Sequence, residues 1–253
     1  MARLANKVCV IAGAAGGVGE AAAERLASEG ATVVGVDMVE HRVGQLSLQA
    51  DLSDEAQVRA LYARIRAEFG RIDVLFNNAG LNDPTDGSAL DTSLETWHRV
   101  QAANLTTVFL CCKHGIPHLL EGEPVNGSVI NTASFLSVMG AATSQMAYSA
   151  AQAGVLALSR DLGVNLARRG VRVNALCMGP VDTPALRTLF ADDPEKVARR
   201  NAHMPMGRFG HPKEVAATVA FLASDDAGYV TASAFPLDGG ITAAYTTPSD
   251  RND

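Results

Sequence analysis

The 253-residue chain has few cysteines and no long apolar run. Its four cysteines, Cys9, Cys111, Cys112 and Cys177, show no C-x-x-C spacing, so we expect reduced thiols that pack in the interior rather than disulfides. No apolar stretch approaches the roughly 20 residues that cross a bilayer, and the first residues lead directly into a short strand. We therefore expect a soluble, cytoplasmic chain without a signal peptide and without a membrane partner.

Positive charge and metal-ligand clusters are also scarce. The 21 lysines and arginines are outnumbered by 27 aspartates and glutamates, which gives a net charge of −6, and no basic run exists. This balance argues against nucleic acid and against an anionic membrane surface as partners. The six histidines are scattered, and no group of histidine, cysteine and carboxylate has ligand spacing. We predict no catalytic metal.

What the sequence does contain is an alternation of apolar runs and amphipathic stretches along its whole length. The apolar runs predict strands at residues 8–11, 32–36, 46–50, 74–76, 128–131, 171–176 and 235–237. Helical spacing of apolar residues predicts helices at 17–29, 54–69, 94–120, 146–166, 182–202 and 212–223. This alternation indicates one α/β domain over residues 1–253, a Rossmann-type doubly wound parallel β-sheet flanked by helices on both faces.

Residues 178–212 are the most irregular part of the chain. The helix predicted there is polar and is broken by Pro184 and Pro194. One interpretation is an exposed excursion with no role in the site. We favour a lid-like segment over about residues 182–212, because covers of active sites are drawn from such weakly packed segments.

A glycine-rich turn follows the first predicted strand. Gly13, Gly17 and Gly19 would let the backbone approach a pyrophosphate at the start of the next helix. Asp37 ends the second strand, twenty residues after Gly17, where a carboxylate accepts from the ribose hydroxyls of NAD and repels the 2′-phosphate of NADP. Met38 offers no cation to bind that phosphate. The pattern predicts NAD (NADH), whereas Asp37 without the glycines would be a solvated turn residue.

These motifs resemble the short-chain dehydrogenase/reductase (SDR) family, in particular enzymes like 3-oxoacyl-carrier-protein reductase. The glycines fall as G-x-x-x-G-x-G, Asn77-Asn78-Ala79-Gly80 follows the fourth strand, and Ser134, Tyr148 and Gly179–Thr183 come in the family's order. The resemblance runs from Lys7 to Ile241. It implies the same fold and NAD-dependent exchange of a hydride with a secondary alcohol or ketone.

The resemblance also assigns residues. Ser134 would form a hydrogen bond with the substrate oxygen, and Tyr148 would give a proton to that oxygen or take one from it. Asn104 would hold a water molecule that takes part in the proton relay. The alternative is that its side-chain amide only forms a hydrogen bond with the backbone of its own helix. The residues implied in cofactor binding are Gly13, Gly17, Val18, Gly19, Asp37, Asp51, Leu52, Asn78, Ala79, Gly80, Tyr148, Gln152, Val181 and Thr183.

The family's Y-x-x-x-K motif has glutamine at its last position here. Tyr148 and Gln152 are four residues apart, so they share one helix face. An amide can replace the lysine's hydrogen bond to the nicotinamide ribose, but it cannot lower the pKa of the tyrosine. Three interpretations stay open: an alcohol dehydrogenase that is slow or has an alkaline optimum, a non-redox enzyme on the SDR scaffold, and an NAD-binding pseudoenzyme.

The expected substrate is a small to medium secondary alcohol or its ketone. Phe135, Gln145 and Leu186 would line a largely apolar pocket beside Tyr148, so acyl thioesters, terpenoids and steroid-like ketones remain candidates. By the resemblance we expect a homotetramer, with a dimer as second choice. Small residues near the tyrosine would allow close helix packing; these are Ala150, Ala151, Ala153 and Gly154.

Overall fold

A single parallel sheet of seven strands organises the protein. The computed structural model describes residues 2–121, 125–190 and 193–247. The strand order is β3-β2-β1-β4-β5-β6-β7, and every neighbouring pair is parallel. The strands are β1 (Val8–Ala12), β2 (Thr32–Asp37), β3 (Leu46–Gln49), β4 (Val74–Asn77), β5 (Gly127–Ser134), β6 (Val171–Met178) and β7 (Ala234–Leu237). The order reverses between β1 and β4, and at such a point a crevice opens outside the carboxyl ends of the strands.

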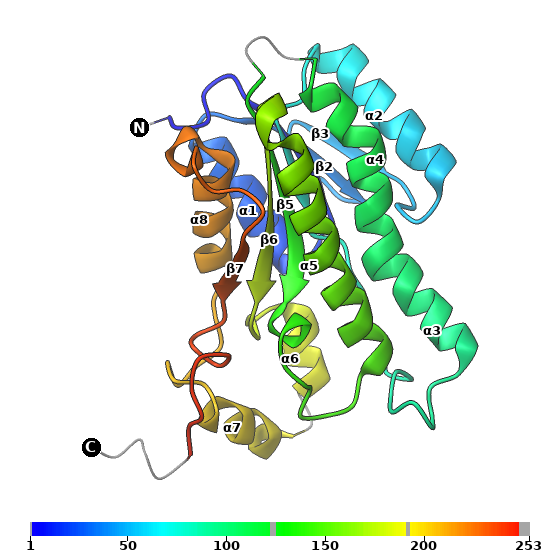
Figure 1. Cartoon of the computed structure of the whole chain (residues 1–253), viewed down its shortest axis with the longest axis vertical. Coiled ribbons are helices and arrows are strands. Elements are labelled where there is room, and N and C mark those ends of the chain that lie inside the picture. Colours follow the sequence, from blue (N-terminus) through cyan, green and yellow to red (C-terminus); the bar gives the residue numbers. More distant parts are fainter. Residues whose placement is uncertain (1, 122–124, 191–192, 248–253) are drawn as a thin grey trace.

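Helices cover both faces of this sheet (Figure 1). Helices α1 and α8 pack on one face, and α2, α4 and α5 pack on the other. The helices are α1 (Gly17–Ser28), α2 (Glu55–Phe69), α3 (Leu94–Gln101), α4 (Thr107–Leu119), α5 (Met146–Leu166), α6 (Pro184–Phe190), α7 (Pro194–Ala202) and α8 (Pro212–Ala223). The predicted Rossmann-type doubly wound sheet is therefore confirmed.

The continuous apolar strands reflect two hydrophobic cores, one on each face of the sheet. Along β1, Val8, Val10 and Ala12 enter the core under α2, α4 and α5, whereas Cys9 and Ile11 enter the core under α1 and α8. Burial of a large apolar side chain contributes about 1.5–3 kcal/mol, so both faces select for hydrophobic residues. All four cysteines are buried and free.

Two predicted helices differ from the structure. The helix expected over residues 94–120 is interrupted by a π-helical turn, η1 (Ala102–Thr106), between α3 and α4. The helix expected over 182–202 is two helices, and Pro184 and Pro194 each stand at the first position of one of them. Proline is tolerated there because the first N–H of a helix has no intrahelical acceptor. These prolines therefore begin helices.

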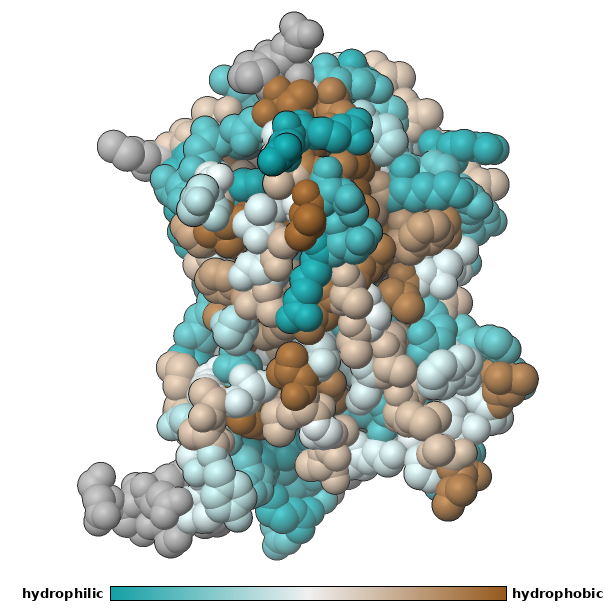
Figure 2. Space-filling model, viewed as in Figure 1, coloured by the Kyte–Doolittle hydropathy of each residue, from teal (hydrophilic) through white to brown (hydrophobic). Residues whose placement is uncertain are grey.

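Helices α6 and α7 lie beyond the carboxyl ends of β5 and β6, over the end of the sheet where the crevice opens (Figure 1). The surface where α7 lies is mainly hydrophilic (Figure 2), in keeping with its sequence PEKVARRNA. No helix among the described residues is long and apolar enough to cross a membrane. On α5, Ala150 and Ala153 are exposed, but a Cβ on Gly154 would lie 2.8 Å from Leu105 of the same chain. Gly154 thus serves packing within the chain.

Candidate active site

The glycine turn between β1 and α1 forms one wall of the site. Gly13 has a φ of +77°, and a Cβ there would lie 2.7 Å from the Cα of Ala79. A Cβ on Gly19 would overlap the carbonyl oxygen of Gly13. Both positions therefore require glycine. Helix α1 begins at Gly17 without a side-chain cap, so its first N–H groups remain available to an anion. Val18, the second residue of this helix, is buried.

Two acidic residues stand at or just after the carboxyl ends of β2 and β3. Asp37 ends β2, and its Oδ2 accepts a hydrogen bond of 2.9 Å from the N–H of Ala15. The carboxylate is thus fixed beside the predicted pyrophosphate loop. Asp51 accepts from the N–H and the hydroxyl of Ser53 at 2.8 and 2.7 Å, and Leu52 is buried in the core.

After β4 the chain passes along the opposite side of the glycine turn. The amide of Asn78 donates to the carbonyl of Gly13 at 3.3 Å, and its Oδ1 accepts from the Thr132 hydroxyl at 3.1 Å. A Cβ on Gly80 would lie 2.9 Å from Oδ1 of Asn104. This segment therefore links the predicted cofactor loop to the predicted catalytic residues.

Asn104 lies in the π turn η1 and is buried, with 1% of its surface exposed. Its Oδ1 accepts from the N–H of Leu81 at 3.1 Å and from Nε2 of Gln152 at 3.3 Å. Its Nδ2 donates to the carbonyls of Leu81 and Val100, both at 2.9 Å. The bond to Val100 is the helix-backbone bond that the alternative interpretation expects. The side chain also bonds directly to Gln152.

Gln152 is buried and has one unpaired atom. Because Oδ1 of Asn104 is an acceptor, the Gln152 atom that faces it must be the donor Nε2. Its Oε1 is buried and has no hydrogen-bond partner among the described residues. Buried polar atoms are normally paired, so this oxygen is an acceptor for a ligand donor.

Ser134 and Tyr148 come together at the carboxyl end of β5. Ser134 is the last residue of β5 and is buried, and Tyr148 is half-buried in the first turn of α5. Burial raises the pKa of the Tyr148 phenol, and a hydrogen bond with the Ser134 hydroxyl lowers it by a smaller amount. The phenol is therefore a weak acid at neutral pH, with a hydroxyl partner and, one helical turn away, the amide of Gln152.

Comparison with known proteins identifies the family. A family model described as enoyl-(acyl carrier protein) reductase matches residues 13–242. Cis-4-hydroxycyclohexanecarboxylate dehydrogenase of Sinomonas cyclohexanicum is 40% identical, over 94% of this chain and 98% of that protein. The 3-oxoacyl-[acyl-carrier-protein] reductase of Thermotoga maritima is 36% identical, over 94% of this chain and 99% of that protein. A crystal structure of levodione reductase superposes with a TM-score of 0.89 at 36% identity, covering 96% of this chain and 100% of that one.

The chain belongs to the short-chain dehydrogenase/reductase family. It is therefore an oxidoreductase by family, of a kind that acts on CH–OH groups with a nicotinamide dinucleotide. The structure fits such a cofactor in two places. Side chains at Gly13 and Gly19 would fill the turn where the family binds the pyrophosphate, and Oε1 of Gln152 is a free acceptor beside Tyr148.

The SDR segment after β6 closes on the glycine turn. Val181 forms an isolated β-bridge with Gly210. The Thr183 hydroxyl accepts from the N–H of Leu186 at 3.2 Å, which caps the start of α6. A Cβ on Gly17 would lie 3.6 Å from the Thr183 side chain. Thr183 thus sits at the amino end of α1, close to the predicted phosphate position.

The three predicted pocket residues come from three different segments of the chain. Phe135 directly follows Ser134, and Gln145 directly precedes α5; both are half-buried. Leu186 instead lines a cavity of about 530 Å³ whose other walls come from residues 182 and 187, α7 and residues 208–211. Tyr148 is not among the described residues that line this cavity.

Some polar residues of the site carry no signal in the sequence. Asp86 is buried and accepts from the backbone of the first turn of α5. The side chain of Gln101 donates to the carbonyl of Ala147 at 2.9 Å. Their partners lie 46 to 62 residues away, and no local spacing reveals contacts over that distance. Between β4 and β5, Nδ2 of Asn77 donates a buried hydrogen bond of 2.8 Å to Oδ1 of Asn131.

Proposed function

We propose that this SDR enzyme is an NAD-dependent oxidoreductase that interconverts a secondary alcohol and a ketone by hydride transfer. The observation that carries the proposal is the meeting of the Ser134 and Tyr148 hydroxyls at the carboxyl end of the sheet, next to the linked amides of Gln152 and Asn104. Ser134 would hold the substrate oxygen, and Tyr148 would give or take its proton. Bound NAD supplies the hydride acceptor, and NADH the donor.

The preference for NAD over NADP rests on Asp37. Its carboxylate is held on the glycine turn by the Ala15 N–H, at the end of β2. A fixed negative charge there accepts from ribose hydroxyls and repels a 2′-phosphate. The next residue, Met38, is 62% exposed and brings no positive charge.

Gln152 sets the pH range of the proposed reaction. Its Oε1 can accept from a hydroxyl of the nicotinamide ribose, which the side chain of lysine cannot do. It carries no charge, so it does not favour the tyrosinate form of Tyr148, whose pKa burial raises. Alcohol oxidation needs that form as the base, and ketone reduction needs the phenol as the acid.

The absence of charge on Gln152 also favours a second candidate, a protein that binds NAD without turnover. A non-redox reaction on the same scaffold is the third. Ser134, Tyr148 and Asn104 favour the oxidoreductase, because all three residues are still present and an idle site need not keep them.

The decisive experiment measures NADH binding and turnover with the same preparation. We expect NADH fluorescence to change on binding. We also expect NADH to be formed or consumed, in alkaline and neutral buffer respectively, with cis-4-hydroxycyclohexanecarboxylate, levodione or a 3-oxoacyl thioester. Tyr148→Phe should bind NADH normally and lose turnover. Binding without turnover of any substrate would support the second candidate, and product without change in NADH the third.

We also propose a cytoplasmic homotetramer in which residues 182–212 act as a lid. Large apolar side chains are exposed on the helices over one face of the sheet, with Phe109 46% exposed on α4 and Val164 71% exposed on α5. Light scattering after size exclusion should give four times the monomer mass, and Phe109→Glu with Val164→Glu should lower it. A monomeric unmodified protein would refute the assembly.

A further inference from the structure

Helix α5 carries Tyr148 in its first turn, yet its own sequence does not cap that turn. The residue before the helix is Gln145, whose side chain makes no capping bond, and the first turn holds no acidic residue. The first N–H groups of any helix lack intrahelical acceptors. The turn that carries the phenol therefore depends on groups from elsewhere in the chain.

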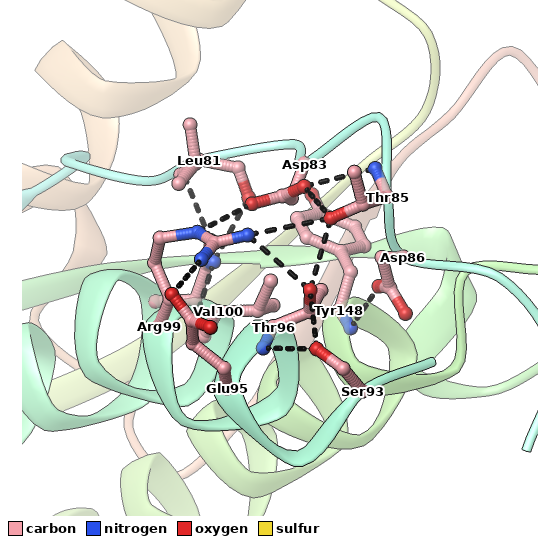
Figure 3. A network of polar contacts seen from close by, with 11 residues as sticks. Leu81, Asp83, Thr85, Asp86, Ser93, Glu95, Thr96, Arg99, Val100 and Tyr148 are labelled. Atoms are coloured by element: carbon pink, nitrogen blue, oxygen red, sulfur yellow. Dashed lines mark hydrogen bonds and ion pairs between the residues drawn. The ribbon is translucent and has the colours of Figure 1, made fainter. Parts of the chain in front are cut away.

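Asp86 supplies the missing cap from the loop after β4. Its carboxylate is buried, and one oxygen accepts from the N–H of Ala147 at 3.0 Å. The other accepts from the N–H of Tyr148 at 2.8 Å (Figure 3). The carbonyl of Gly87 accepts from the N–H of Met146 at 3.2 Å. Three successive N–H groups are thus paired by two residues of one loop. The negative charge also lies at the positive end of the helix dipole.

The loop that carries Asp86 is itself fastened to α3. Asp83 accepts from Nε of Arg99 at 2.7 Å, and this bond is the main reason why the pKa of Asp83 lies well below its usual range. The hydroxyls of Thr85 and Thr96 lie 2.9 Å apart, and both accept from Arg99 (Figure 3). Asp86 therefore projects from a braced segment, so its position is set independently of α5.

We propose that Asp86 is a positioning residue for the proton-transfer tyrosine: by capping α5 at the backbone of Tyr148, it holds the phenol against Ser134. This inference rests on the proposed function for the role of Tyr148 in turnover, but the placement of the phenol can be tested without turnover. Loss of the carboxylate should free the first turn of α5, admit water to the phenol and weaken its bond with Ser134.

Asp54 provides a matched control. It also caps a helix with its carboxylate: from the exposed position just before α2, its Oδ1 accepts from the N–H of Ala56 at 2.8 Å and of Gln57 at 3.2 Å. Replacing either aspartate by alanine removes one aspartate cap from one helix, but only Asp86 caps the helix of Tyr148. If Asp86 only stabilised the fold, Asp86→Ala and Asp54→Ala would have the same effect on the titration of Tyr148 and on turnover.

The test is a pH titration of carbon-13-labelled tyrosine by NMR, which has four signals to resolve in this chain. The signal of Tyr148 is assigned with Tyr148→Phe. In Asp86→Ala we expect the apparent pKa of Tyr148 to fall towards the ordinary value of about 10, while Asp54→Ala leaves it unchanged. Asp86→Asn keeps one acceptor oxygen, so the apparent pKa of Tyr148 in this variant should lie between those of the unmodified protein and Asp86→Ala. It replaces the alanine variant in the test if that variant fails to fold.

Turnover gives a second reading. With an active substrate, Asp86→Ala should lower kcat at least tenfold while the Kd for NADH changes less than twofold, and Asp54→Ala should alter neither. An unchanged Tyr148 titration in both Asp86 variants would overturn the proposal, whatever their thermal stability. A shifted titration in a protein that turns over no substrate would leave the positioning intact and refute only the proposed reaction.

Discussion

At the scale of single residues, the pair of amides at positions 104 and 152 defines the chemistry of this SDR site. Asn104 makes four hydrogen bonds, which fix its oxygen towards Gln152. Gln152 must then present its own oxygen elsewhere, and that oxygen has no partner in the part of the chain that the structure describes. The site therefore offers a neutral acceptor where the family's motif has a cation. Under the proposed function we expect the Tyr148 base to form only at alkaline pH.

Replacing Gln152 by lysine should restore base at neutral pH. A pKa lowered by about three units increases the tyrosinate population about a thousandfold, but a base of lower pKa is also weaker, so we expect a gain of about 10- to 1000-fold at pH 7. Oxidation and reduction should rise together, because the overall equilibrium does not change. Steady-state rates between pH 6 and 10 measure this.

The unmodified protein provides the comparison for that variant. Its oxidation rate should climb about tenfold per pH unit in the neutral range, because the pKa of Tyr148 is raised and the phenol is protonated there. Its reduction rate should be level over the same range. Gln152→Met, which has neither charge nor amide, should show no gain. An oxidation rate that is already level at pH 7 would contradict the argument.

Asp37 should control the choice of cofactor. Asp37→Ser removes the negative charge, and we expect the Kd for NADH to rise about 10- to 100-fold with the loss of a charged hydrogen bond. Adding Met38→Arg should allow NADPH to bind. Asp37→Asn, which keeps an acceptor for the Ala15 N–H, separates the charge from the support of the turn. Equal binding of NADPH by the unmodified protein would refute this assignment.

At the scale of elements, the π turn η1 is the feature that joins the loop after β4 to the catalytic helix. It presents Asn104 to the backbone of Leu81 on one side and to Gln152 on the other. π turns are rare and are frequently found at functional sites. Gly154 of α5 allows this turn to pack closely, through Leu105.

Replacement of Asn104 by alanine should destabilise the fold as well as the site. It leaves the N–H of Leu81 and the amide of Gln152 without their acceptor in a buried position, which costs about 2–4 kcal/mol. Asn165→Ala removes an exposed helix asparagine that bonds only to the Asp161 carbonyl, and it should cost less than about 0.5 kcal/mol. Urea unfolding measures both. Equal losses would contradict the account of η1.

Periodicity in the sequence predicts the regular elements well. All seven strands were expected from the sequence. Most are short apolar runs between turn residues, and the two-sided burial of β1 explains why its residues do not alternate, whereas β3 at the edge of the sheet does alternate, with the sequence LSLQ. Residues 102–106 could not be read as a π turn, since their apolar spacing also fits a continuous helix. Pro184 and Pro194 indicated that the helix predicted over residues 182–202 is broken. That each proline begins a helix of its own could not be predicted, because it depends on the direction of the chain before the proline.

The site is less accessible to sequence reasoning than the fold. Gly13, Asp37 and Tyr148 follow from local motifs, and all three lie near the carboxyl ends of the parallel strands. Asp86 has no such motif, because its function depends on backbone groups 61 and 62 residues further on. Leu186, predicted for the pocket with Phe135 and Gln145, lines the cavity between α6 and α7, and its place in the substrate pocket stays a prediction.

At the scale of the whole molecule, ion pairs tie the amino-terminal segment to the rest of the chain. Both oxygens of Glu29, at the end of α1, accept from Arg3 at 2.7 Å. Lys7 pairs with Asp225, after α8, at 2.8 Å. The hydrogen bond from Arg3 lowers the pKa of Glu29, and that from Lys7 lowers the pKa of Asp225. Both carboxylates therefore stabilise the folded state only when ionised.

Stability should consequently fall in acid. A carboxylate whose pKa is lowered by folding contributes fully above its unfolded pKa of about 4 and loses that contribution as the pH falls through the folded value. Urea midpoints should be level from pH 7 to about 5 and then decline. In Glu29→Gln the decline should be shallower than in Glu24→Gln, which alters an exposed glutamate of the same helix. The same slope in both would contradict the assignment.

The number of residues in the π turn η1 also matters for this site. A π turn holds one residue more than an α-helical turn, so it accommodates that residue and keeps the helix after it in phase. Deleting one residue from Ala102–Thr106 should therefore fuse α3 and α4 into an unbroken helix that keeps Val108 and Cys111 in the core. The deletion would nevertheless remove the turn that presents Asn104, and no substitution changes the number of residues in that turn. The position of Asn104 thus depends on the length of this segment as well as on its residue types.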